Sequence, residues 1–264
     1  MAVAIIMNKT LIHIDPTTLP PRVRPYIHGA RTYDSSCSDM ARTIYLEGDI
    51  RAFLKIAQAG KLAREVRMSR FMHSHGLAPR VIEYVSDECH DYLLTEALEG
   101  EDGISDGHLQ APDRLAIVFG ESLRLVHQLP VRECPIQGRT AELISESQAN
   151  INRGYKDSAI ITEDLSPAAR QLDRLKALGR DEVVIHGDYC LPNILLRDFR
   201  LSGFVDLGTG GVGDRHYDLF WGIWTLAYNL KTDRYKDVFL DAYGRQELDP
   251  ERLELSRLLA GFTQ

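Results

Sequence analysis

The sequence lacks cysteine pairs, long apolar runs and an excess of basic charge. Its four cysteines are widely separated and form no Cys-x-x-Cys pair, which argues against zinc or a disulfide framework and indicates reduced thiols in the cytoplasm. No stretch approaches the roughly 18 to 20 apolar residues that a membrane-spanning helix requires. The formal net charge of −7 argues against nucleic-acid partners and leaves a cationic partner open.

The sequence also lacks an internal repeat, a low-complexity tract and an evident targeting signal. Its apolar opening, MAVAIIMNKTLIHI, has no basic residues before the hydrophobic run and no evident cleavage site, so we expect it to be native chain. The 264 residues suffice for one large domain or two closely joined lobes. We expect a monomer or a weak dimer.

Strand-like runs dominate the first hundred residues, and helical patterns dominate the remainder. RTIYL, AFLKIA, RVIEYV and DYLLTEAL have the apolar, β-branched and aromatic character of strands. After the Gly- and acid-rich LEGEDG, the segments APDRLAIVFGESLRLVHQLP, HYDLFWGIWTLAYNL and DPERLELSRLLAGF have helical patterns. We therefore predict an α+β fold, with a sheet-rich lobe over 1–97 and a helical lobe over 98–264.

Two short apolar runs end in polar loops. In VVIHGDYCLPNILLRD (183–198), a glycine and a proline interrupt regular structure, so we expect a rigid loop that projects Asp188 and Asn193. In LSGFVDLGTGGVGD, Asp206 ends an apolar run in front of several glycines. We expect a β-hairpin-like pair that brings these three side chains to one place. Their oxygens suit magnesium, and Asp188 could instead orient an incoming hydroxyl.

A lysine inside a strand-like run is the candidate for neutralising phosphate. Lys55 lies between apolar residues in FLKIA, where a buried ammonium group requires a partner. Glu65, on the predicted helix that follows, could supply it.

These segments together resemble the aminoglycoside phosphotransferases, relatives of the protein kinases, and most closely the 3′-phosphotransferases, the kanamycin and neomycin kinases. The motif H-G-D-x-x-x-x-N at His186 and the Asp-Leu-Gly segment at Asp206 carry the resemblance, with FLKIA, LRLVHQLPVRECP and the late Tyr243-Gly244. It runs from about residue 20 to 262. It implies a bilobal protein-kinase-like fold and an antibiotic-resistance enzyme that transfers the γ-phosphoryl group of ATP or GTP to a hydroxyl of an aminoglycoside, expected to be the 3′-hydroxyl.

The resemblance also implies roles for the polar residues. Asp188 would be the catalytic base or hydroxyl-orienting group, and Asn193 and Asp206 would hold Mg²⁺. Lys55, braced by Glu65, would contact the α- and β-phosphates.

The remaining nucleotide contacts implied by the resemblance involve the backbone. Groups of Glu96 and Leu98 would hydrogen-bond the adenine edge. Ser35, Ser36 and Ser38 would form the turn over the phosphates.

Acceptor binding by this family uses clustered carboxylates from three places, and this sequence departs from that pattern. The acceptor is expected to be a cationic small molecule. The residues that the resemblance implies for binding it are Asp157, Glu163, Asp164, Tyr228 and Phe262. Tyr228 stands where relatives tend to carry an acidic residue, and LLAGFTQ lacks an Asp-Glu pair before its aromatic residue. A kinase of the same fold that acts on a non-aminoglycoside antibiotic or a metabolite therefore stays open.

Two further classes of protein are alternatives. A non-catalytic nucleotide-binding protein would be expected to have lost at least one of Lys55, Asp188, Asn193 and Asp206. A hydrolytic metal site would use His186, Asp188, Asp206, Asp214 and His216, and it would act without ATP.

Overall fold

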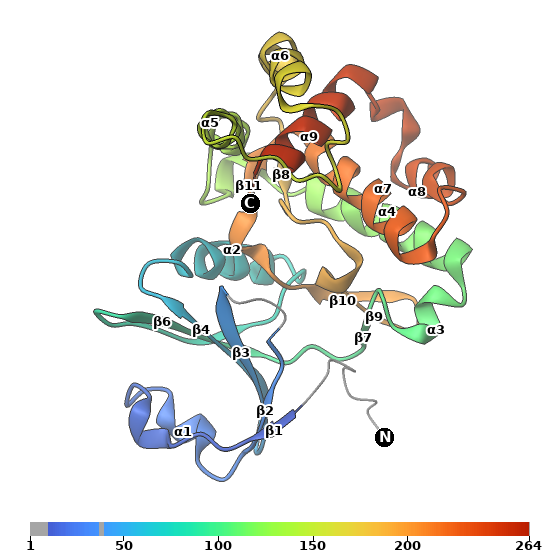
Figure 1. Ribbon diagram of the computed structural model, residues 1–264. Coiled ribbons are helices and arrows are strands. Elements are labelled where there is room, and N and C mark those ends of the chain that lie inside the picture. Colours follow the sequence, from blue (N-terminus) through green and yellow to red (C-terminus); the bar gives the residue numbers. More distant parts are fainter. Residues whose placement is uncertain (1–9, 37–39, 264) are drawn as a thin grey trace. The chain divides into compact units, whose positions relative to one another are not determined.

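The structure is a computed structural model, which describes residues 10–36 and 40–263 of the chain. By their contacts, the described residues form two compact units (Figure 1). The first comprises the described residues up to Ser105 together with Ile194–Gly208, and the second comprises Asp106–Asn193 and the described residues from Thr209 onward. None of the helices in the described part of the chain is long and apolar enough to cross a membrane.

A six-stranded antiparallel sheet forms the body of the first unit. Its strand order is β1-β2-β3-β4-β6-β5. The bounds are Thr10–Ile12 for β1, Arg31–Asp34 for β2, Ala41–Glu47 for β3, Arg51–Gln58 for β4, Val81–Ser86 for β5 and His90–Glu96 for β6. The four strand-like runs of the sequence become β3 to β6, which confirms them as strands.

Different helices cover the two faces of this sheet. On one face, α1 (Arg24–Ile27) and the turn before it pack against a cluster that contains Leu54. On the other face, α2 (Ala63–Ser74) packs against a cluster that contains Ala57. Alternate residues of a strand share a face, so Lys55 lies on the α2 side of the sheet.

A second, three-stranded sheet joins the two stretches of chain that make up the first unit. Its order is β10-β9-β7, with bounds Glu101–Asp102 for β7, Ile194–Arg197 for β9 and Arg200–Phe204 for β10. β9 and β10 form a hairpin through a turn at Asp198 and Phe199, which both have positive φ. The apolar run at 183–185 does not join this hairpin, because it pairs with residues 211–213. The N–H of Phe204 also donates to the Leu77 carbonyl at 2.8 Å. These contacts assign 194–208 to the first unit, whereas the boundary predicted after residue 97 kept that segment with the helices.

The second unit consists mainly of helices. Their bounds are Asp106–Leu109 for α3, Pro112–His127 for α4, Arg139–Asn152 for α5, Leu165–Leu175 for α6, Arg215–Leu230 for α7, Lys236–Tyr243 for α8 and Pro250–Phe262 for α9. A two-stranded antiparallel sheet pairs β8 (Val183–Ile185) with β11 (Gly211–Gly213). The three helical segments of the sequence become α4, α7 and α9, as predicted.

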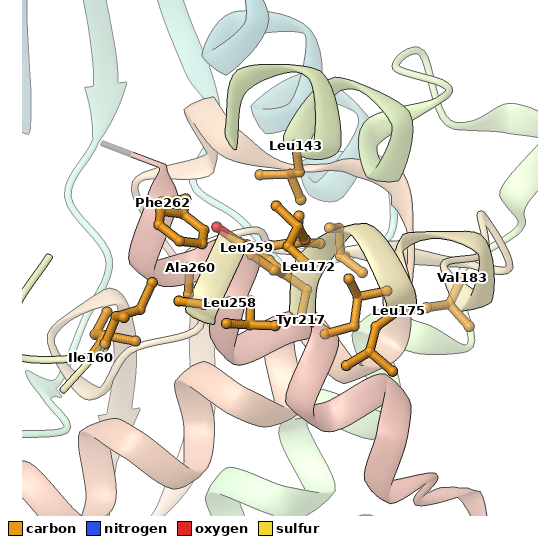
Figure 2. Packing of buried hydrophobic residues seen from close by; sticks show 14 residues of the cluster. Leu143, Ile160, Leu172, Leu175, Val183, Tyr217, Leu258, Leu259, Ala260 and Phe262 are labelled. Atoms are coloured by element: carbon orange, nitrogen blue, oxygen red, sulfur yellow. The ribbon is translucent and has the colours of Figure 1, made fainter. Parts of the chain in front are cut away.

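One apolar cluster fixes the strand that leads into the predicted catalytic loop. Side chains from α5, α6, α7 and α9 meet those of β8, and Figure 2 shows Leu143, Tyr217 and Phe262 among them. Ile185, the last residue of β8, is fully buried. The loop that follows therefore starts from a rigid point, because closely packed interiors resist displacement.

Candidate active site

A pocket of about 210 Å³ lies within the first unit. Most of its lining is apolar, and Lys55, Glu65 and Asp206 bring charge to it. The lining residues are Ser35, Ala41, Thr43, Phe53, Lys55, Glu65, Pro79, Leu93, Thr95, Glu96, Leu98, Leu195, Val205 and Asp206. The structure thus brings most of the predicted nucleotide-contacting residues together in one pocket.

Lys55 is the centre of an ion-pair network in this pocket. Its Nζ lies 2.8 Å from Glu65 Oε2 and 3.1 Å from Glu65 Oε1, and it also pairs with the Asp206 carboxylate. Burial alone would lower the pKa of Lys55, but the two carboxylates raise it above its ordinary value. The lysine is therefore charged at neutral pH, and the predicted pairing with Glu65 is present.

Asp206 lies at a special backbone position. Its φ of 59° is in the left-handed region, which few residues other than glycine, asparagine and aspartate adopt readily. Its side chain is 54% exposed and lines the pocket. Aspartate is therefore one of the few residues that can adopt this backbone conformation and also present a carboxylate to the pocket.

The serine turn contributes Ser35 to the lining of the pocket. Ser35 is buried, and its N–H donates to the Thr43 carbonyl at 2.9 Å. The Thr43 N–H in turn donates to Ser36 Oγ at 3.0 Å, which pins the turn to β3. Ser35 lines the pocket, Ser36 stabilises the turn, and Ser38 lies outside the described residues.

The segment after β6 lines the pocket through Glu96 and Leu98. The Glu96 N–H donates to the Arg80 carbonyl at 3.0 Å, and the Arg80 guanidinium binds the Glu96 carboxylate. Of the backbone groups assigned to adenine recognition, the Glu96 N–H therefore already has a partner inside the unit.

Phe53 is an aromatic residue of the pocket that was not predicted from the sequence. Phe53 lies two residues before Lys55 on β4, and its ring packs against Tyr45 with centroids 5.1 Å apart. The available signal was the period of two in a strand, which puts Phe53 and Lys55 on the same face.

In the second unit, the loop after β8 holds Asp188 in one orientation. Asn193 Nδ2 donates to Asp188 Oδ2 at 2.8 Å and to the Asp188 carbonyl at 3.0 Å. The Asp188 N–H donates to His186 Nδ1 at 3.3 Å. The two oxygen-bearing side chains of the motif are therefore direct neighbours, and His186 braces the loop.

Asp218, on α7, holds this loop through hydrogen bonds to its backbone. Its side chain is fully buried and accepts the N–H of His186 at 2.7 Å and the N–H of Gly187 at 2.8 Å. His127 Nε2 lies 3.2 Å from the same carboxylate, and His127 Nδ1 lies 2.8 Å from the Tyr243 hydroxyl. A chain of buried polar groups therefore runs from α8 through α4 and α7 to the loop.

The residues of the hydrolytic alternative do not form an open metal site. Glu182, Asp214 and His216 have ligand atoms within 4.8 Å of one another. However, Arg252 lies 2.8 Å from Asp214 and 2.6 Å from Glu182, and His216 Nδ1 lies 2.8 Å from Asp214. A guanidinium group thus occupies the place that a cation would take.

The predicted acceptor carboxylates are partly engaged. Glu163 pairs with Arg257, at 2.5 Å and 3.3 Å, and this hydrogen bonding lowers the pKa of Glu163. Asp157 Oδ1 accepts the N–H of Ala159 at 2.8 Å, whereas Asp164 precedes α6 without a hydrogen bond from its side chain to the helix N-terminus. The acidic loop is therefore less available to ammonium groups than its sequence indicates.

The two aromatic residues assigned to the acceptor have opposite exposures. Tyr228 is 57% exposed, stacks on Trp224 with centroids 5.0 Å apart, and has the Lys231 Nζ 4.2 Å from its ring centroid. Phe262 is fully buried in the core cluster (Figure 2). In this structure its ring holds the end of α9 in place.

Known proteins share both sequence and fold with this chain. Residues 40–255 match the model of a phosphotransferase enzyme family. The chain is 36% identical over 252 residues to a probable aminoglycoside 3′-phosphotransferase of Lactococcus lactis subsp. lactis (strain IL1403), covering 94% of this chain and 96% of the relative.

Two solved structures share the fold. An aminoglycoside 3′-phosphotransferase of type VIII superposes with a TM-score of 0.77 at 24% identity, covering 92% of this chain and all of the other. A Streptomyces rimosus aminoglycoside phosphotransferase in complex with ADP and streptomycin superposes with a TM-score of 0.71 at 22% identity, over 84% of this chain and 90% of the other. The predicted bilobal, protein-kinase-like fold is confirmed.

Proposed function

The chain belongs to the phosphotransferase enzyme family, and from this premise we propose that it transfers the γ-phosphoryl group of ATP or GTP to a hydroxyl of an aminoglycoside, expected to be the 3′-hydroxyl. The observation that carries the proposal is the Asp188 carboxylate, held by Asn193 in a loop that Asp218 anchors. We further expect the enzyme to be a monomer or a weak dimer. We also expect it to work in the cytoplasm, where the described cysteines, which form no disulfide, would stay reduced.

The pocket of the first unit is the proposed nucleotide site. Lys55 would neutralise the α- and β-phosphates, and Phe53 would provide an aromatic face for the base. In the second unit, Asn193 uses its Nδ2 for Asp188, which leaves its Oδ1 as a hard donor. In the first unit, Asp206 offers a carboxylate. Each is an oxygen donor of the kind that Mg²⁺ prefers, and by the family resemblance the two would hold the ion, which would neutralise charge on the phosphate oxygens.

In the proposed reaction, Asp188 acts on the acceptor hydroxyl. Its carboxylate accepts a hydrogen bond from the hydroxyl and takes its proton as the oxygen–phosphorus bond forms. The bond between the γ-phosphorus and its bridging oxygen breaks, and the nucleoside diphosphate leaves with that electron pair.

Phosphorylation of a panel of 4,6- and 4,5-linked aminoglycosides tests this function. With magnesium and ATP or GTP, we expect nucleotide-dependent phosphorylation of at least one compound, detected by mass spectrometry and coupled assay. Absence of turnover across the panel, with nucleotide still bound, would contradict the aminoglycoside acceptor. It would favour another acceptor or a non-catalytic nucleotide-binding protein.

A second candidate acceptor is a hydroxyl compound with fewer ammonium groups. The observation that favours it is the pairing of Glu163 with Arg257, which removes one carboxylate from the acidic loop. The two candidates differ in salt dependence. A polycation held by unpaired carboxylates should show a KM that rises as salt is added, whereas a weakly charged acceptor should not.

Replacement of Asp206 by asparagine should weaken magnesium-dependent nucleotide binding by at least about 10-fold, the loss typical of a perturbed metal site. Asparagine keeps the shape of the side chain and tolerates the left-handed backbone at φ 59°, so the variant removes charge without adding strain. Isothermal titration with ADP, with and without magnesium, measures the effect.

The matched control for this variant is Asp198→Asn. Asp198 also has positive φ, is exposed, and lies outside the pocket lining. Equal affinities of Asp206→Asn and Asp198→Asn for ADP in the presence of magnesium would contradict the assignment of Asp206.

A further inference from the structure

The first turn of α5 contacts several segments that surround the predicted catalytic loop. Arg139 is buried, and its Nε–H donates to the Thr209 carbonyl at 2.9 Å, across 70 residues of sequence. Its Nη1 also binds Glu142 at 3.0 Å, which orients the guanidinium group. The neighbouring Thr140 instead binds the chain before β8 and the start of α7.

The Thr209 carbonyl lies between Arg139 and Gly187. A Cβ atom on Gly187 would lie 2.2 Å from the Thr209 oxygen and 2.5 Å from its carbonyl carbon, so no side chain fits there. Gly187 also has a φ of +85°, which glycine adopts readily. The Thr209 peptide therefore rests directly on the backbone of the residue that precedes Asp188.

We propose that Arg139 is a positioning residue for phosphoryl transfer, which holds the Thr209 carbonyl against Gly187 and thereby fixes Asp188. The inference rests on the proposed function and deepens it. Asp218 secures the loop by hydrogen bonds to the N–H groups of His186 and Gly187, and Thr209 supports it through the contact at Gly187.

The chemistry of the contact explains why an arginine is suited to it. A hydrogen bond from a charged donor to a carbonyl is stronger than a neutral one, and the bond to Glu142 leaves the guanidinium little freedom. Without Arg139, the Thr209 peptide can shift away from Gly187. A displacement of about 1 Å in a reacting group can reduce a rate about 100-fold.

The test compares Arg139→Met, Arg139→Lys and Thr140→Val. Thr140→Val removes hydrogen bonds from the same helix turn but leaves the contact with Thr209 untouched, so it is the control for a merely structural role. We expect Arg139→Met to lower kcat about 10- to 100-fold, with the ADP Kd changed less than threefold, because no α5 residue lines the pocket. Arg139→Lys should recover part of the loss, and Thr140→Val should lower Tm but keep kcat.

Two rates are measured for each variant: phosphorylation of the aminoglycoside that the wild type modifies, and slow nucleotide hydrolysis with water as the acceptor. A wild type that hydrolyses nucleotide but modifies no aminoglycoside would contradict the proposed acceptor and leave the second rate as the test of Arg139. An Arg139→Met rate within threefold of wild type, or an equal loss of rate in Thr140→Val, would overturn the positioning role. A wild type without either rate would overturn both proposals.

Discussion

Replacement of Asp188 by asparagine is expected to lower turnover by about 100- to 10,000-fold, the range for removal of a general base. The amide keeps the size of the carboxylate, and its oxygen can still accept the hydrogen bond from Asn193 Nδ2. It cannot take a proton from the acceptor hydroxyl. Because Asp188 does not line the nucleotide pocket, the affinity for ADP should change little.

Steady-state kinetics and ADP titration on the same preparations measure the two parts of this prediction. The control is Asp173→Asn on α6, where the carboxylate is 66% exposed and pairs with Lys176 on the surface. Turnover of Asp188→Asn within fivefold of this control would contradict the role of Asp188. A loss of turnover accompanied by an equal loss of ADP affinity would indicate damage to the fold.

Replacement of Asp218 by leucine is expected to destabilise the second unit by about 2–6 kcal/mol. The physical reason is that the buried N–H groups of His186 and Gly187 would lose their acceptor, at about 1–3 kcal/mol for each unsatisfied group. This loss is a large fraction of the free energy of unfolding of a typical native protein, which is roughly 5–15 kcal/mol. Asp218→Asn, which retains one acceptor oxygen, should cost less.

Urea unfolding followed by circular dichroism measures this effect. Asp241→Leu is the matched control, because Asp241 lies on the surface of α8 and pairs with exposed Arg245. The control should change the free energy of unfolding by less than about 0.5 kcal/mol, as surface substitutions usually do. If Asp218→Leu unfolds at the same urea concentration as this control, the carboxylate does not anchor the loop.

The two carboxylates have different expected roles: Asp188 takes part in the reaction, and Asp218 holds the loop in place. Asp188 is partly exposed, whereas Asp218 is fully buried and accepts hydrogen bonds from the loop backbone. A loss of turnover without a loss of stability is therefore expected from Asp188, and a loss of both from Asp218.

Several features could be predicted because their causes are local in sequence. The strands β3 to β6 and the helices α4, α7 and α9 follow from residue spacing and from residue types such as Asp249-Pro250 at a helix start. The pairing of Lys55 with Glu65 spans only ten residues, from a strand to the helix that follows it. The hairpin between Asn193 and Asp206 is similarly short.

The sequence by itself thus determined the α+β architecture and the residues available for phosphoryl transfer, because short-range patterns and a compact motif carry that information. Only the tertiary structure decided which polar groups are engaged. Glu163 meets Arg257 across 94 residues, and Asp218 meets His186 across 32 residues. Burial of Phe262 and the contact of Arg139 with Thr209 likewise depend on packing between distant segments. Spacing along the chain does not encode such partners, because they are selected by how the helices and strands pack in three dimensions.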